Sequence, residues 1–142
     1  MATFGREARY DDEPWGDRRT GLDGVRGYYS ELLGALPDLS IVVNRWHAGV
    51  ESVVVEATIR GTHEGSWRGL PATGRRVEFA LCGIFDFDDG DRLAGERIYY
   101  DRGEVLRQLG LFREPSTALG RIVTVLTHPV TVLRALLRSS GR

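Results

Sequence analysis

The chain has 142 residues, and its 19 Lys plus Arg against 20 Asp plus Glu give a formal net charge of −1. That balance supplies no overall field to attract nucleic acid or an anionic membrane, and the length predicts one domain with a sizeable core. Cys82 is the single cysteine, which excludes an internal disulfide; together with an N-terminus that lacks an apolar run, this predicts a cytoplasmic protein.

The first half of the chain predicts a loop, a helix and a strand pair. Residues 10–20 mix acids, Pro and Gly, which is typical of a loop. Residues 21–34 place apolar side chains at spacings of three and four, and Pro37 follows, so we expect an amphipathic helix there. Residues 40–47 and 52–60 are rich in β-branched side chains and predict a hairpin.

The second half predicts a long connection and another hairpin. Residues 61–75 hold too many glycines for a regular element, and residues 77–87 and 93–101 flank a turn-rich stretch. Side chains alternate along a strand, so Arg97, Tyr99 and Asp101 share a face. If the turn is symmetric about Gly90, that face is also the one that carries Phe79, Leu81, Gly83, Phe85 and Phe87.

Helical patterns close the chain at residues 103–109, 116–127 and 130–138, with Pro129 as a break. Arginines interrupt the apolar run, so we expect no membrane-spanning segment. Antiparallel strand pairs combined with helices, without alternating βαβ units, predict an α+β fold.

Two glycine-containing motifs and the hairpin that follows them indicate a family. Gly-Thr-His-Glu-Gly at 61–65, Gly-Leu-Pro-Ala-Thr-Gly-Arg at 69–75 and the hairpin ending in Asp101 resemble the SnoaL-like polyketide cyclases of the NTF2-like superfamily. The resemblance implies an NTF2-like cone, in which a curved mixed or antiparallel sheet wraps against helices around an apolar pocket. It also implies a strand-borne aspartate as general acid/base, with no metal and no organic cofactor.

The resemblance further implies a domain organisation. We expect a single NTF2-like domain over residues 1–142, with its core at about 10–111 and a C-terminal helical extension at about 116–139. Family members usually begin with a long helix that residues before Tyr10 do not supply. We therefore expect the extension to cover that position, on its own subunit or on a partner.

Asp101 matches the position of the cyclase aspartate. A carboxylate facing an apolar pocket would be desolvated, which raises its pKa toward the range useful for proton transfer at neutral pH. The alternative is that Asp101 caps the helix that begins near Gly103, because Asp is a preferred N-cap residue. Both interpretations remain open from the sequence.

Three further side chains are candidates for assisting roles. Arg97 could stabilise a developing enolate, or it could be a solvated surface arginine. Glu13 precedes Pro14 in a segment similar to the loop that carries the general base of ketosteroid isomerase. His63 could orient a carbonyl or shuttle a proton, although a histidine in such a connection is more often a local hydrogen-bonding group.

The remaining predicted site residues would bind substrate. They are the aromatic and aliphatic side chains Tyr99, Phe79, Leu81, Phe85 and Trp46. The three histidines are far apart in the sequence, so we expect no metal site.

The resulting hypothesis is a cofactor-independent, polyketide-cyclase-like enzyme that acts on an apolar carbonyl compound, as a homodimer. Epoxide hydrolysis or epoxide opening, and a non-catalytic small-molecule-binding module, are the alternatives.

Overall fold

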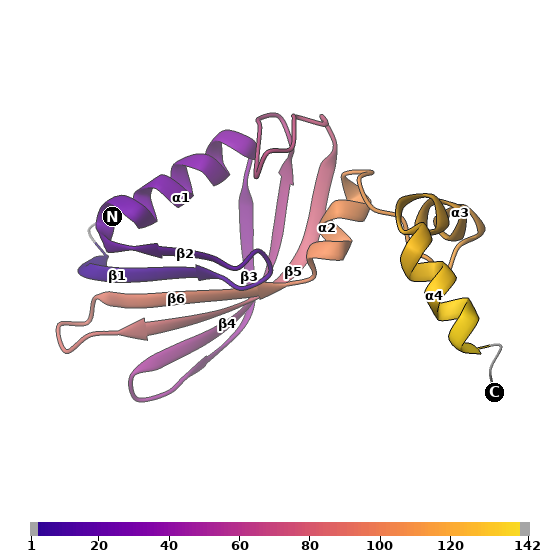
Figure 1. Cartoon of the computed structure of the whole chain (residues 1–142). Helices are drawn as coiled ribbons and strands as arrows, with labels where there is room; N and C mark the ends of the chain where they lie inside the picture. The colour runs from indigo at the N-terminus through magenta and orange to yellow at the C-terminus, as the bar shows by residue number, and fades with distance from the viewer. Residues whose placement is uncertain (1–2, 140–142) are drawn as a thin grey trace. The chain divides into compact units, whose positions relative to one another are not determined.

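The computed structural model describes residues 3–139, which form six strands and four helices (Figure 1). The chain divides into two compact units, Met1–Leu109 and Gly110–Arg142, and each is described by itself.

The first unit holds one six-stranded sheet and two helices. Its strands are β1 (Phe4–Asp12), β2 (Asp17–Thr20), β3 (Ser40–Ala48), β4 (Ser52–Thr62), β5 (Arg76–Phe87) and β6 (Leu93–Tyr100), and its helices are α1 (Gly21–Ala35) and α2 (Arg102–Gln108). The strand order is β2-β1-β6-β5-β4-β3, in which β1 runs parallel to β6 and the other neighbours are antiparallel. The predicted α+β class is therefore confirmed.

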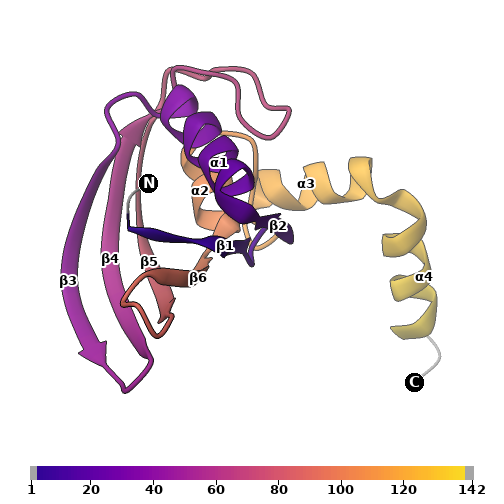
Figure 2. The same cartoon turned by 90° about the vertical axis from the view of Figure 1, so that its left-hand side faces the viewer.

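The sheet is strongly curved, and α1 lies across its concave side (Figure 2). Two clusters of buried side chains hold the layers together. One cluster gathers Tyr10, Tyr28 and Ile98 where α1 meets β1 and β6. The other gathers Leu36, Trp67, Val77 and Leu109, and it joins the end of α1 to β5, α2 and the 61–75 connection. The space between the clusters is the site described below.

The predicted loop at residues 10–20 is wrong, because most of that segment lies in β1 and β2. Ala8, Tyr10 and Asp12 are buried, whereas the charged side chains between them face outward. This is the period-two pattern of a half-buried strand, with an acid at one of the inward positions. Only residues 13–16 form the turn between the two strands.

The glycine-rich connection at residues 61–75 packs directly on the end of α1. The backbone N–H groups of Glu64 and Gly65 donate hydrogen bonds of 3.0 and 3.2 Å to the Ala35 carbonyl oxygen. A Cβ atom at Gly65 would overlap the Gly34 carbonyl, so this close approach requires glycine. The connection thus supplies two donors to one of the carbonyls that a helix C-terminus leaves unpaired.

The second unit consists of α3 (Ala118–Thr127) and α4 (Pro129–Ser139), broken at Pro129 as the sequence predicts. The Thr117 hydroxyl caps α3 by accepting a 3.0 Å hydrogen bond from the Gly120 N–H. Each helix exposes an apolar stripe that includes Ile122 and Leu126 in α3, and Leu133 and Leu137 in α4. No helix among residues 3–139 combines the length and the apolar character that crossing a bilayer requires.

Candidate active site

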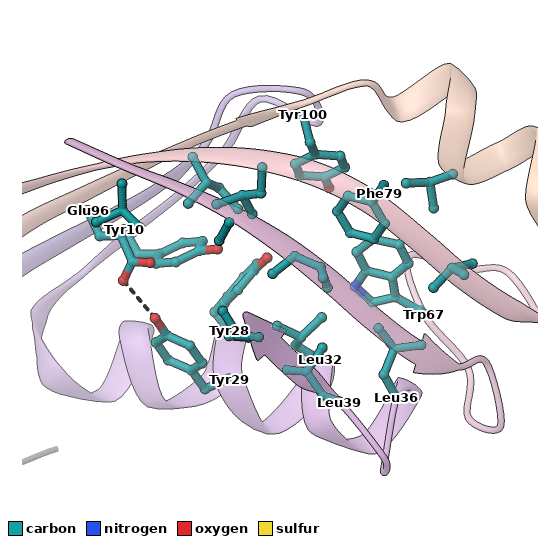
Figure 3. Close-up of a pocket in the computed structure, with 18 of the residues that line it drawn as sticks. Tyr10, Tyr28, Tyr29, Leu32, Leu36, Leu39, Trp67, Phe79, Glu96 and Tyr100 are labelled. Carbon is teal, nitrogen blue, oxygen red and sulfur yellow. Dashed lines mark hydrogen bonds between the residues drawn. The ribbon is translucent and has the colours of Figure 1, made fainter. Parts of the chain in front are cut away.

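A cavity of about 210 Å³ lies between α1 and the concave face of the sheet (Figure 3). Its walls are mostly aliphatic and aromatic side chains, including Leu36, Leu39, Val55, Ile59, Phe79, Leu81 and Phe85. Ile41 and Val43 on the edge strand β3 line it while remaining exposed, so the cavity opens at that edge. An apolar, concave space with few polar groups is the usual form of a small-molecule site.

Glu96 is the only carboxylate that lines this cavity among the described residues. It projects from β6 opposite Phe85 of β5 and Tyr10 of β1, and the residue is 7% exposed. Tyr29 Oη on α1 donates a 2.6 Å hydrogen bond to Glu96 Oε2 (Figure 3). Burial raises the pKa of Glu96 to about 7, although the Tyr29 hydrogen bond partly opposes that rise.

Tyrosine rings form much of the wall around Glu96. The ring centroids of Tyr10 and Tyr28 are 3.9 Å apart, and the Tyr29 ring packs edge-on against both. Tyr100 packs against Phe79 further along the cavity, at 5.1 Å between centroids. Burial raises the pKa of each of these four tyrosines, so their hydroxyls stay protonated and able to donate.

A buried ion-pair cluster lies behind the tyrosine wall. Arg68 donates from Nη2 to Asp12 Oδ2 at 2.7 Å and from Nη1 to Asp17 Oδ2 at 2.6 Å. Tyr28 and Tyr100 also donate to Asp12 Oδ2, at 3.3 and 3.4 Å. Asp12 is fully buried, and burial raises its pKa while Arg68 opposes the rise. Asp12, Arg68 and Asp17 do not line the cavity, but they hold two of its tyrosines in place.

The prediction that Arg97, Tyr99 and Asp101 share the cavity face is wrong, because the hairpin contains a bulge. The pair Phe87 and Leu93 is symmetric about Gly90, as predicted, but the register then shifts by one residue. From there Phe85 pairs with Glu96, and the following pairs on that face are Gly83 with Ile98 and Leu81 with Tyr100. A one-residue shift turns every following side chain to the other face.

Asp101 therefore lies outside the cavity, at the start of α2. Its side chain is 68% exposed and accepts a 3.1 Å hydrogen bond from the Glu104 N–H. This is the N-cap arrangement that the sequence left open as an alternative. Arg97 points away from the cavity as well and pairs with Asp86 Oδ2 at 3.4 Å, and Tyr99 is exposed.

Two further predicted residues also lie outside the cavity lining. Glu13 follows the buried Asp12 and accepts a 2.8 Å hydrogen bond from Arg18 Nη2 in the β1–β2 turn. Trp46 is 63% exposed on β3. A register shift at Asn44 pairs Trp46 with Val55, a cavity residue, so Trp46 shares the concave face without lining the cavity.

Four predicted residues, His63, Phe79, Leu81 and Phe85, do line the cavity. The part each plays toward a ligand stays a prediction. Reasoning from the sequence missed Glu96 and Asp12, which are adjacent in sequence to the candidates Arg97 and Glu13. Among residues 3–139, no group of three or more His, Cys, Asp or Glu side chains is arranged to hold a metal ion.

This cavity, enclosed by a curved sheet and a crossing helix, is that of a protein with a ketosteroid isomerase-like fold. The chain belongs to the SnoaL-like polyketide cyclase family, whose model matches residues 4–109. No curated protein matches the sequence.

Solved structures show the same fold. A protein from Jannaschia sp. CCS1 described as a SnoaL-like polyketide cyclase is 22% identical, with a TM-score of 0.70 over 76% of this chain and 74% of the other. TsrD from Streptomyces laurentii is 26% identical, with a TM-score of 0.69 over 78% and 80%. A hypothetical protein with a ketosteroid isomerase-like fold from Catenulispora acidiphila DSM 44928 is 18% identical, with a TM-score of 0.67 over 78% of each chain.

Proposed function

We propose that this protein is a cofactor-independent enzyme of the polyketide-cyclase type, which uses Glu96 as general acid/base on an apolar carbonyl compound. The observation that carries the proposal is a buried carboxylate, with a pKa raised to about 7, inside an apolar cavity. A catalytic group works best when its pKa lies near the operating pH, and desolvation is how a carboxylate reaches that range.

The proposed reaction is an intramolecular ring closure that needs no oxidant or reductant. The Glu96 carboxylate takes a proton from the carbon next to a substrate carbonyl, which leaves an enolate and a neutral Glu96. The enolate carbon attacks a second carbonyl of the same molecule, and a carbon–carbon bond forms. Glu96 then returns its proton to the new alkoxide, so the product is an isomer of the substrate. Tyr29, hydrogen bonded to Glu96, fixes the carboxylate for both transfers.

The first half-reaction can be tested without knowing the substrate. 2-Tetralone is an apolar ketone with acidic α-protons, and ¹H NMR follows their exchange in D₂O. We expect the wild-type protein to accelerate exchange and Glu96→Gln to lose roughly 10²- to 10⁴-fold of that acceleration. Glu56→Gln is the matched control, because Glu56 is exposed on β4. Equal rates for wild type and Glu96→Gln would contradict the proposal.

One observation favours epoxide opening as a second candidate function. Arg68 bridges the carboxylates of Asp12 and Asp17, the kind of arrangement expected to activate water. From the sequence, Asp101, Arg97 and Glu13 were the residues expected to supply it. Asp12 Oδ1 is buried without a hydrogen-bond partner among the described residues. Hydrolysis of styrene oxide by the wild-type protein, abolished in Asp12→Asn and retained in Glu96→Gln, would support this candidate over the first.

A non-catalytic binding module would bind 2-tetralone without accelerating its exchange. The cytoplasmic location, the homodimer and the covering role of the C-terminal extension stay predictions. So do the assisting roles expected for Arg97 and Glu13.

A further inference from the structure

His63 also belongs to the cavity wall, and one of its ring nitrogens lacks a partner among the described residues. Four buried side-chain atoms among the described residues make no hydrogen bond: Asp12 Oδ1, Trp15 Nε1, His63 Nε2 and Arg68 Nε. Of the residues that carry them, only His63 lines the cavity. Because an unpaired buried polar group is costly and rare, this nitrogen calls for an explanation.

The contacts of Nδ1 determine the tautomer of His63. The Thr73 backbone N–H donates to Nδ1 at 3.3 Å, and the Thr73 hydroxyl lies 3.1 Å from the same nitrogen. That hydroxyl accepts a hydrogen bond from the Arg75 N–H, which leaves its proton free to face Nδ1. A nitrogen that accepts a backbone N–H bond carries no proton, so Nδ1 is bare and a neutral His63 holds its proton on Nε2.

Burial keeps the ring neutral. His63 is 1% exposed, and desolvation lowers its pKa, since no ion pair compensates the charged form among the described residues. With Nδ1 turned toward Thr73, Nε2 is the ring nitrogen left without a partner among the described residues. Since His63 lines the cavity, the apolar wall contains a buried N–H donor with a fixed tautomer.

His63 and Glu96 lie at opposite ends of the cavity. Glu96 pairs across β5 and β6 with Phe85, whereas Thr62, the neighbour of His63, pairs with Arg76. These two positions are nine residues apart in β5, roughly 30 Å of extended strand before the curvature of the sheet is allowed for. In Figure 3, Glu96 lies at one end of the cavity and Trp67, from the 61–75 connection, at the other.

We propose that His63 Nε2–H donates a hydrogen bond to a ligand oxygen remote from the reacting carbon, so that the ligand is an elongated apolar molecule with an acceptor oxygen at the end far from Glu96. The inference rests on the proposed function, because it takes this cavity as the substrate site. A donor in this position selects ligands that carry the oxygen, since an analogue without it leaves the N–H unpaired.

The first test needs no ligand and no variant that could misfold. Long-range ¹H–¹⁵N correlation NMR distinguishes the two neutral tautomers and the charged ring. The chain has three histidines, and His47→Gln and His128→Gln identify the signals of the other two. We expect His63 to be neutral with its proton on Nε2 at neutral pH, because burial lowers its pKa. A proton on Nδ1, or a charged ring at neutral pH, would overturn the proposal.

The second test compares two compounds of the same shape, 2-acetylnaphthalene and 2-isopropenylnaphthalene, in which a carbonyl oxygen is replaced by a methylene group. We expect the wild-type protein to bind the ketone roughly 5- to 30-fold more tightly, as one buried hydrogen bond allows. Calorimetric titration measures both affinities. Equal affinities, or no binding of either compound, would refute the inference.

Variants separate this inference from the proposed catalytic role. His63→Phe should bring the affinity ratio close to one, and His63→Gln, whose amide can still donate, should keep part of the preference. Glu96→Gln should keep the whole preference while losing proton exchange. A preference that survives in His63→Phe and disappears in Glu96→Gln would place the ligand oxygen at Glu96 and contradict the role of His63, leaving the proposed function intact.

Discussion

Tyr29 on α1 donates a 2.6 Å hydrogen bond to Glu96 on β6, and this bond joins the helix to the sheet across one end of the cavity. Two effects on the pKa of Glu96 oppose each other. Burial favours the neutral form of Glu96, whereas a hydroxyl donor favours its carboxylate. The bond therefore holds the pKa of Glu96 near neutrality instead of letting it rise further.

Removing the hydroxyl should shift the pH dependence of proton transfer. In Tyr29→Phe the carboxylate loses its donor, so the pKa of Glu96 rises and the midpoint of the pH–rate curve moves to higher pH. The expected shift is up to about one unit, because such a bond contributes about 1 kcal/mol. Tyr28→Phe is the control, since the Tyr28 hydroxyl bonds Asp12, and its midpoint should not move. A shift toward lower pH in Tyr29→Phe would contradict this account.

Stability should depend on pH through Glu96. Its pKa is raised from 4.5 to about 7 in the fold, so the native state binds more protons than the unfolded chain between those values. The free energy of unfolding therefore falls as pH rises from about 4.5 to about 7, by about 3 kcal/mol in total. Urea unfolding of wild type and Glu96→Gln across this range isolates the contribution as their difference. A difference that does not vary with pH would contradict the assignment.

Arg68 should be far more important for stability than an exposed arginine in a similar pair. Arg68→Ala leaves Asp12 buried without its cation and should cost about 3 to 5 kcal/mol. Arg60→Ala breaks an exposed pair with Glu78 that solvent screens, so it should lower the stability much less. Urea midpoints measure both variants. Similar losses in the two variants would show that the buried cluster does not have the role described.

Variants at Asp101 test whether this side chain lies outside the cavity, as the register of the hairpin places it. Asn is as good an N-cap as Asp, so Asp101→Asn should keep both the stability and the exchange rate of the wild type. Asp101→Ala should lose about 0.5 to 2 kcal/mol of stability through the lost cap and still retain the exchange rate. Loss of exchange in Asp101→Asn, with the fold intact, would return the catalytic role to Asp101 as the family resemblance implies.

The sequence predicted the larger elements because their hydrophobic periodicity is strong. The helix at 21–34, the strands of both hairpins and the break at Pro129 all lie within a residue or two of the observed elements. β1 was missed because charged residues separate its few inward side chains, and one of these is itself an aspartate. An acid at an inward strand position is more typical of a loop. Only the structure shows that Arg68 pairs with Asp12 and makes its burial possible.

The predicted site differs from the observed one on β6, because of a single-residue bulge that leaves no clear mark in one sequence. The turn at Gly90 was placed correctly. However, the register shift between Asp86 and Phe87 puts Glu96 on the cavity face, where Arg97 was expected. The shift at Asn44 has the opposite consequence, because it turns Trp46, a predicted site residue, toward the concave face. Propensity and alternation predict which residues form strands, but hydrogen-bond pairing across the sheet decides which face each one occupies.

The pH–rate profile of 2-tetralone exchange, measured for wild type and Glu96→Gln, tests whether Glu96 is the proton-transfer group. A carboxylate base is active when deprotonated, so the wild-type rate above the solvent background should rise with pH and level off above a midpoint near 7. That protein-dependent rate should be absent in Glu96→Gln at every pH. A wild-type midpoint near 4.5, the ordinary value for a glutamate, or a profile that Glu96→Gln reproduces, would contradict the assignment of Glu96 as the proton-transfer group.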